Sequence, residues 1–259
     1  TKAVASSNNL RMKNLAAAIS NGPKTDMIVV NQFFVNTAYG CHIERESSVT
    51  IVNPLGRGDN GLSYFDWHIA QLGGFNYVAN ELFSRTNPNP DLRCNFYTVL
   101  DDENPVFQQF IDDITKGRGK NDWIVVIAGE QIVKNSPYDF HFELGGEKGE
   151  TSLDFDGAIP NDMETVKRLF EDFSNTLEET LQIRTDAHQI QPKVGKQNIA
   201  RYLKTKTEAN VLLITVSYDL MIFNKNVHEA ILQAATVLNR NLETRKPHGL
   251  HKEHYGRRP

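Results

Sequence analysis

Apolar residues recur along the chain with two different periods, which predicts a mixture of helices and strands. Helical periodicity, with apolar residues three and four positions apart, is clearest over residues 161–181 and 226–242. Asn104 is expected to cap another helix, because proline follows it and suits the first helical position. The helices predicted in this way cover residues 9–19, 63–83 with a kink or break at Gly73-Gly74, a segment from Asn104, 161–181, 196–203 and 226–242.

Other segments have the apolar runs or the two-residue alternation of β-strands. Residues 123–128 are continuously apolar, which is typical of a central strand buried on both faces. Residues 211–223 alternate apolar and polar side chains, which predicts a half-buried antiparallel strand. The strands expected from these patterns cover residues 26–35, 47–52, 92–100, 123–128, 138–144 and 211–223.

The order of these elements predicts an α+β fold with a mixed, mainly antiparallel sheet, flanking helices and an extended C-terminal arm. Strict alternation of strands and helices is missing, and so is a glycine-rich turn between a strand and a helix. We expect one domain over residues 1–243 and the arm over residues 244–259. The 259 residues are 39% apolar and 23% charged, which excludes disordered and collagen-like chains.

Charge is divided between two blocks, although the whole chain carries a formal charge of only −4. Residues 139–179 carry a net charge of −9, and residues 184–259 carry +7. The leading hypothesis is therefore a non-enzymatic structural subunit of a homomeric assembly, such as a viral or bacteriophage particle component. The basic arm would contact an acidic patch on a neighbouring copy. The arm residues are Arg245, Lys246, Lys252, Arg257 and Arg258, and the patch residues are Glu147, Glu150, Asp154 and Asp156.

Two His-x-Glu pairs support an alternative hypothesis, a metal-dependent hydrolase or nuclease. His42 and Glu44 form one pair, and His141 and Glu143 form the other. Residues two apart on a strand share a face, so each pair presents an imidazole and a carboxylate together. Four such groups would converge on one divalent metal if the two strands were neighbours. Solvent-facing polar residues that alternate with core residues would produce the same pattern.

A second alternative is a nucleic-acid-binding protein that uses the basic arm. The main hypothesis requires no catalytic residue, metal or cofactor, and the partners expected are other copies of the chain. Nucleotide-binding glycine loops and serine-hydrolase elbows do not occur in the sequence. Two cysteines and the lack of an apolar leader favour a cytoplasmic protein, or a virion component if the chain is viral, without membrane contact.

Overall fold

The computed structural model describes residues 33–55, 62–84, 87–94, 96–98, 100–130, 139–144, 159–181, 183, 185–186, 198–218, 220–221 and 226–245. The predicted helix at residues 9–19 and most of the predicted strand at residues 26–35 lie outside these ranges. The strands are β1 (Phe33–Asn36), β2 (Gly40–Glu44), β3 (Val49–Asn53), β4 (Asn76–Asn80), β5 (Trp123–Glu130), β6 (Phe140–Glu143), β7 (Thr185–Asp186) and β8 (Asn210–Ser217). The helices are α2 (Leu62–Gly73), α3 (Pro105–Thr115), α4 (Met163–Leu181), α5 (Ile199–Lys206), α6 (Val227–Leu242) and the short 3₁₀ turn η1 (Pro90–Leu92).

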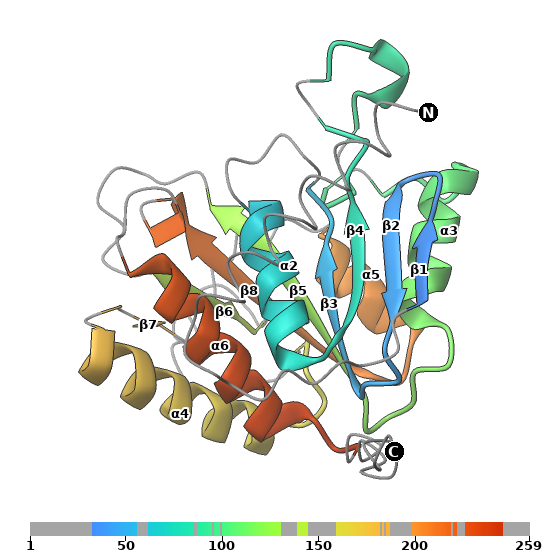
Figure 1. The fold of residues 1–259 in the computed structure, drawn as a ribbon. Helices are drawn as coiled ribbons and strands as arrows, with labels where there is room; N and C mark the ends of the chain where they lie inside the picture. Colours follow the sequence, from blue (N-terminus) through green and yellow to red (C-terminus); the bar gives the residue numbers. More distant parts are fainter. Residues whose placement is uncertain are drawn as a thin grey trace, which may run out of the picture. The chain divides into compact units, whose positions relative to one another are not determined.

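One mixed sheet contains all eight strands, in the order β1-β2-β4-β3-β5-β8-β6-β7 (Figure 1). The central strands β4, β3, β5 and β8 run parallel to one another. Antiparallel pairs join β1 to β2, β2 to β4 and β6 to β8, and β6 and β7 are parallel. The predicted mixed sheet with flanking helices is therefore confirmed, while the expected antiparallel pairing holds only on the two sides of a parallel centre.

Helices cover both faces of the sheet, so the fold has three layers (Figure 1). Apolar side chains of α2, α4 and α6 pack on one face, in a cluster that includes Phe65, Leu169 and Leu238. Side chains of α3 and α5 pack on the other face, in a second cluster that includes Phe107 and Leu203. Alternate residues of each central strand enter the two clusters, which is the pattern expected of parallel strands with helical connections.

The prediction of a half-buried strand at residues 211–223 is corrected by β8. All eight residues of β8 are buried, and the strand ends at Ser217. Its neighbours are the parallel strand β5 and the antiparallel strand β6. The polar positions Thr215 and Ser217 therefore lie inside the protein, where polar groups need partners, and do not face solvent as the alternation suggested.

Two other predictions are wrong because of local turns. The helix expected over residues 63–83 ends at Gly73, and Gly74 takes a positive φ of 70°, which glycine adopts at little cost. The chain then reverses into β4, which holds Tyr77 and Val78 in the core. Residues 92–100 were expected to form a strand, but their described part contains turns after η1.

The predicted helices at Asn104, 161–181 and 226–242 are confirmed. Asn104 caps α3 by accepting hydrogen bonds from the backbone N–H groups of Val106 and Phe107 at 2.9 and 3.3 Å. In front of α4 the Asp162 carboxylate caps the helix by accepting the N–H of Thr165 at 3.0 Å. No helix in the described ranges is long and apolar enough to cross a membrane.

Asn76 fixes the connection between β2 and β3 from inside the protein. Its side-chain oxygen accepts the N–H groups of Arg45 and Ser47 at 2.7 and 3.3 Å, and its amide nitrogen donates to the Ser47 carbonyl at 2.7 Å. The buried Arg45 guanidinium donates to the carbonyl of Phe75 and to Gln71, at the C-terminal end of α2. One amide thus supplies the backbone partners that this connection would otherwise lack.

Replacing Asn76 with alanine is expected to reduce the free energy of unfolding by about 2 to 4 kcal/mol, because several buried backbone groups lose their partners. Urea unfolding followed by circular dichroism measures this change. Gln233→Ala is the control, because the half-buried Gln233 of α6 donates to Glu229 in a hydrogen bond at the surface, and its effect should stay below about 1 kcal/mol. Equal effects of the two substitutions would contradict the role assigned to Asn76.

Candidate functional site

The topology predicts a candidate site at the carboxyl ends of the central strands. From β3 the chain passes through α2 to β4 on one side, and then returns through α3 to β5 on the other side of β3. The helices α2 and α3 lie on opposite faces of the sheet. In open sheets with parallel strands, ligands bind outside the carboxyl ends of the strands where the connections diverge in this way. We call this end of the sheet the carboxyl edge.

Two buried asparagines organise the carboxyl edge at β3 and β4. Asn53, the last residue of β3, accepts the N–H of Leu55 at 3.0 Å, and its amide lies 3.5 Å from the hydroxyl of Ser63 in the first turn of α2. Asn80, the last residue of β4, donates to the carbonyls of Pro54 and Phe83, each at 3.0 Å. These amides hold the start of each connection against the strand that it leaves.

A buried polar group lies where β8 ends and β6 begins. His141 and Glu143 share one face of β6, and Asp139 directly precedes this strand; the exposed fractions of Asp139, His141 and Glu143 are only 7%, 5% and 9%. His141 is in register with Thr215 of β8, and Asp139 bonds Ser217. Because β6 runs antiparallel to β8, Asp139 and His141 lie toward the carboxyl edge. We call Asp139, His141, Glu143, Thr215 and Ser217 the β6–β8 polar group.

Hydrogen bonds fix the position of the Ser217 hydroxyl within this group. Its hydroxyl donates to an oxygen of the Asp139 carboxylate at 3.1 Å and accepts the N–H of Leu220 at 3.2 Å. The Ser217 N–H also donates to the Asp139 carbonyl at 2.9 Å. A hydroxyl that donates its proton to a carboxylate is held in place by that bond, so Ser217 positions Asp139. Buried carboxylates and an imidazole at this edge can accept or supply protons.

The two His-x-Glu pairs are not brought together, which corrects the predicted four-ligand metal site. Four strands separate β2, which carries His42 and Glu44, from β6, which carries His141 and Glu143. At the usual spacing of about 4.8 Å between strands, the two pairs lie about 24 Å apart. Across the described residues, no group of three or more His, Cys, Asp or Glu side chains is placed to hold a metal ion.

His42 and Glu44 belong to a network between β2 and α3. Two Arg118 nitrogens donate to the Glu44 carboxylate at 3.2 and 2.7 Å, and His42 Nε2 lies 3.5 Å from the same carboxylate. His42 Nδ1 lies 3.8 Å from Asp113, which accepts the Tyr39 hydroxyl at 2.6 Å. The carboxylates of Glu44 and Asp113 accept hydrogen bonds from Arg118 and Tyr39, which joins β2 to α3, while His42 Nε2 and Arg118 Nε are buried without a hydrogen-bond partner among the described residues.

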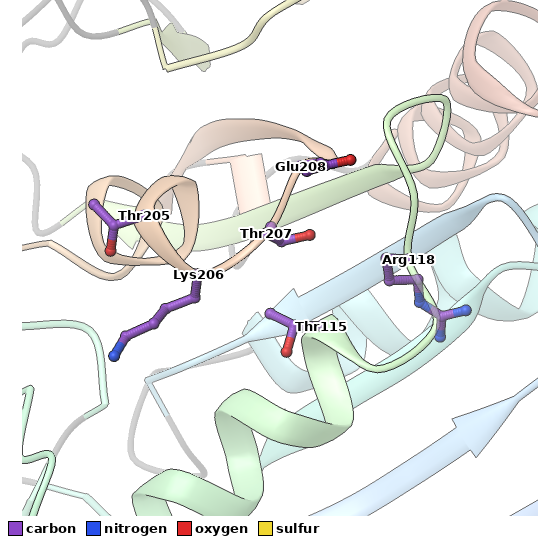
Figure 2. Close-up of a pocket in the computed structure, with 6 residues that line it drawn as sticks. All are labelled: Thr115, Arg118, Thr205, Lys206, Thr207 and Glu208. Carbon is purple, nitrogen blue, oxygen red and sulfur yellow. The ribbon is translucent and has the colours of Figure 1, made fainter.

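A shallow cavity of about 450 Å³ lies beside this network, at the opposite end of the sheet from the carboxyl edge (Figure 2). Its cations are already engaged: Arg118 binds Glu44, and Lys206 lies 3.8 Å from Asp102. In Figure 2 the Lys206 and Arg118 side chains extend to opposite sides of the cavity. Its lining residues are Thr115, Arg118, Thr205, Lys206, Thr207 and Glu208. They offer no convergent charge for a ligand.

The first residue of the predicted contact arm binds its own chain. Arg245 donates to the carboxylate of Asp122 at 2.8 Å and to the carbonyl of Glu46 at 3.2 Å. Glu243 accepts hydrogen bonds from the N–H and hydroxyl of Ser48, at 3.0 and 2.6 Å, beside this contact. The arm residues Lys246, Lys252, Arg257 and Arg258 lie outside the described ranges, as do the acceptor residues Glu147, Glu150, Asp154 and Asp156. Contacts between copies and the division at residue 243 stay predictions.

Comparison with solved structures shows which fold the chain shares. A metallo-carboxypeptidase from Burkholderia cenocepacia is similar over 89% of this chain and 67% of its own, with a TM-score of 0.51 and 12% sequence identity. A bacteriophage poly-gamma-glutamate hydrolase is similar over 87% and 93%, with a TM-score of 0.47 and 12% identity. The cell shape determinant protein Csd4 from Helicobacter pylori is similar over 82% and 55%, with a TM-score of 0.44 and 9% identity. No family model and no curated protein matches the sequence.

The fold comparison contradicts the leading hypothesis from the sequence. The chain shares its fold with a metallo-carboxypeptidase. The expectation of a non-enzymatic virion component was therefore wrong. It relied on the lack of a local catalytic motif, but the residues that meet at the carboxyl edge come from separate strands and leave no such motif.

Sequence reasoning singled out His141 and Glu143 but missed the rest of the carboxyl edge. Asn53 lies one residue beyond the strand predicted over residues 47–52 and was not assigned to an element. The polar positions Thr215 and Ser217 were noticed as one face of a strand and assigned to solvent. The available signal was their alternation with apolar residues, which a buried polar face produces as well as an exposed one.

The Glu44 network generates a prediction about pH. Burial raises the pKa of Glu44, but the contacts with His42 and Arg118 outweigh it and lower the pKa from 4.5 to about 2. Ionised Glu44 therefore stabilises the fold above about pH 4.5, and this contribution disappears as the pH falls toward 2. Wild type should be more stable than Glu44→Gln at pH 7, and the difference should shrink between pH 4.5 and 3.

Urea unfolding of both proteins at several pH values measures this difference. The matched control is Glu179→Gln, at an exposed position of α4, which should leave the pH dependence of stability unchanged. A wild-type advantage over Glu44→Gln that is equally large at pH 7 and pH 3 would refute the coupling between Glu44 and Arg118.

Proposed function

We propose that this chain is a hydrolase that cleaves an amide bond in a peptide-like substrate at the carboxyl edge of its sheet. The observation that carries the proposal is the β6–β8 polar group, in which Asp139 and His141 are buried at the end of the parallel strand β8 and Glu143 lies two residues further along β6. Polar groups are costly to bury, so their concentration beside the end of the sheet that binds ligands favours a role in chemistry. The hydrolase hypothesis drawn from the His-x-Glu pairs is thus retained, with a different set of residues.

The resemblance to a metallo-carboxypeptidase supports this choice of bond and edge. That protein carries a metal by name, and the described residues of this chain do not assemble a three-ligand site. A bound ion would need ligands besides those that the described strands bring together. The roles below therefore belong to the chain itself: His141 and Glu143 exchange protons with substrate or water, and Ser217 orients Asp139 by its hydrogen bond.

Hydrolysis of peptides with a free C-terminal carboxylate tests the proposal directly. The full-length chain is incubated with a mixture of such peptides, with and without added Zn²⁺, Mn²⁺ or Mg²⁺, and release of amino acids is followed by mass spectrometry. We expect release of a residue in at least one metal condition, and loss of that release on adding a chelator if an ion takes part. A phosphodiester substrate, assayed in parallel, distinguishes a nuclease.

The two histidines of the original metal hypothesis form a matched pair of variants. His141→Gln should lower kcat/KM about 100-fold or more, because a proton-transfer group is lost from the carboxyl edge. His42→Gln should leave kcat/KM within about twofold of wild type, since His42 lies four strands away from β6. Thermal unfolding of both variants shows whether either change acts through stability.

Two results would count against the proposal. One is no hydrolysis of any peptide by a folded chain in any metal condition. The other is a larger loss of activity in His42→Gln than in His141→Gln, because this would move the chemistry to β2 and α3. Activity on the phosphodiester alone would keep a hydrolase but change the bond that it cleaves.

A further inference from the structure

Three of the four large apolar side chains that are exposed among the described residues lie on α2 and α6. Tyr64, Leu72 and Leu232 have exposed fractions of 44%, 53% and 38%. The fourth, Leu82, is 41% exposed and follows β4, away from these helices. A cluster of exposed apolar residues on neighbouring helices is unusual for a surface that stays in water, and it is typical of a contact with another molecule.

These helices run side by side and in the same direction, which joins their exposed residues into one surface. At their N-terminal ends the Tyr64 hydroxyl lies 3.1 Å from Nδ1 of His228. Near their C-terminal ends the side-chain amide of Asn239 donates to the carbonyl of Gly73 at 2.8 Å. The outward-facing residues of the two helices are therefore neighbours in pairs. Tyr64 lies beside His228, and one turn further along each helix His68 lies beside Leu232.

We call this surface the α2–α6 seam, and it consists of Tyr64, His68, Leu72, His228, Leu232 and Thr236. It contains no acidic or basic side chain other than imidazole. His68 donates its Nδ1 proton to the carbonyl of Tyr64 at 2.7 Å, and its ring centroid lies 3.9 Å from that of Tyr64. Burial lowers the pKa of His68, which favours the neutral imidazole. The Thr236 hydroxyl is turned back to the carbonyl of Leu232 at 2.8 Å.

Polar pairs border the seam on the side of α6. Arg240 donates to the carboxylate of Asp172 on α4, and Gln233 donates to Glu229 at 2.7 Å. An apolar centre surrounded by polar residues is the usual arrangement of a protein–protein interface. The seam is therefore exposed to solvent, and the seam and its border together have the residue composition of a protein–protein interface.

We infer that the α2–α6 seam binds the same seam of a second copy of this chain, forming a two-fold dimer. In a two-fold contact each residue faces itself or a close neighbour, so a charged surface would face its own charge. The seam avoids this cost because it is uncharged, and paired helices from two copies can pack as four. The sequence analysis predicted a homo-oligomer with contacts through the basic arm. This proposal is also a homo-oligomer, but its copies contact each other through α2 and α6.

The size of the seam sets the expected strength of the dimer. Helices of 12 and 16 residues are about 18 and 24 Å long. Two such helices side by side, each about 10 Å wide, offer on the order of 400 Å² per copy, about half of the roughly 800 Å² per partner of a standard stable interface. We therefore expect a dimer that dissociates in the micromolar range and not a permanent one.

Sedimentation of the full-length chain between about 1 and 200 µM tests this inference. Wild type should change from monomer to dimer over that range. Leu72→Lys combined with Leu232→Lys should remain monomeric at 200 µM, since these changes place like charges opposite one another in a two-fold contact. The control Leu82→Lys changes an equally exposed leucine outside the seam and should dimerise as wild type does. Circular dichroism confirms that each variant is folded.

Two outcomes would overturn the inference. A wild type that is monomeric at 200 µM shows that the seam does not bind a second copy. A dimer that survives the two seam substitutions, or that only Leu82→Lys disrupts, shows that copies associate elsewhere. Neither outcome bears on the proposed hydrolase activity, which is measured at nanomolar enzyme concentration.

Discussion

Burial of the central strands on both faces is the constraint on which the rest of this structure depends. Every residue of β3 and β8 is buried, and residues 123–128 of β5 are buried as well. Such strands need helices on both sides of the sheet, and helical connections between neighbouring strands make those strands parallel. Parallel strands bring their carboxyl ends to one edge. Polar residues that are distant in the sequence, such as Asn53 and Ser217, thereby reach the same end of the molecule.

The two ends of the sheet have different roles in this account. Close to the amino-terminal ends of β5 and β8, ion pairs such as Arg245 with Asp122 join the ends of helices and connections to the sheet. These contacts are satisfied within the chain and stabilise the fold. Toward the carboxyl edge, Asp139 and His141 are buried near the ends of strands. The division separates the two His-x-Glu pairs: His42 and Glu44 join the network with Arg118, while His141 is buried toward the carboxyl edge.

The sequence predicts local features of this fold well and long-range features poorly. Asn104 followed by proline, and the apolar residues of α4 and α6, are sufficient to predict three helices because their signals are local. The strand β4 was missed because Gly73 and Gly74 look alike in sequence, while only Gly74 takes the positive φ that ends the helix. The site could not be predicted for a similar reason: whether β6 lies beside β2 or beside β8 is decided by pairing across the whole chain. Alternation in β8 predicted its polar face but not the elements that bury it.

Hydrogen exchange with a bound peptide product tests the placement of the site most directly. Amide exchange is measured by mass spectrometry on the full-length chain, with and without a short peptide that carries a free carboxylate and with added Zn²⁺. The account predicts slower exchange in the described residues near the carboxyl edge, 52–55, 139–144 and 215–218, and no change in residues 40–45 or 115–118. Slower exchange confined to residues 40–45 and 115–118 would contradict it, because the ligand would then bind at the His42 network.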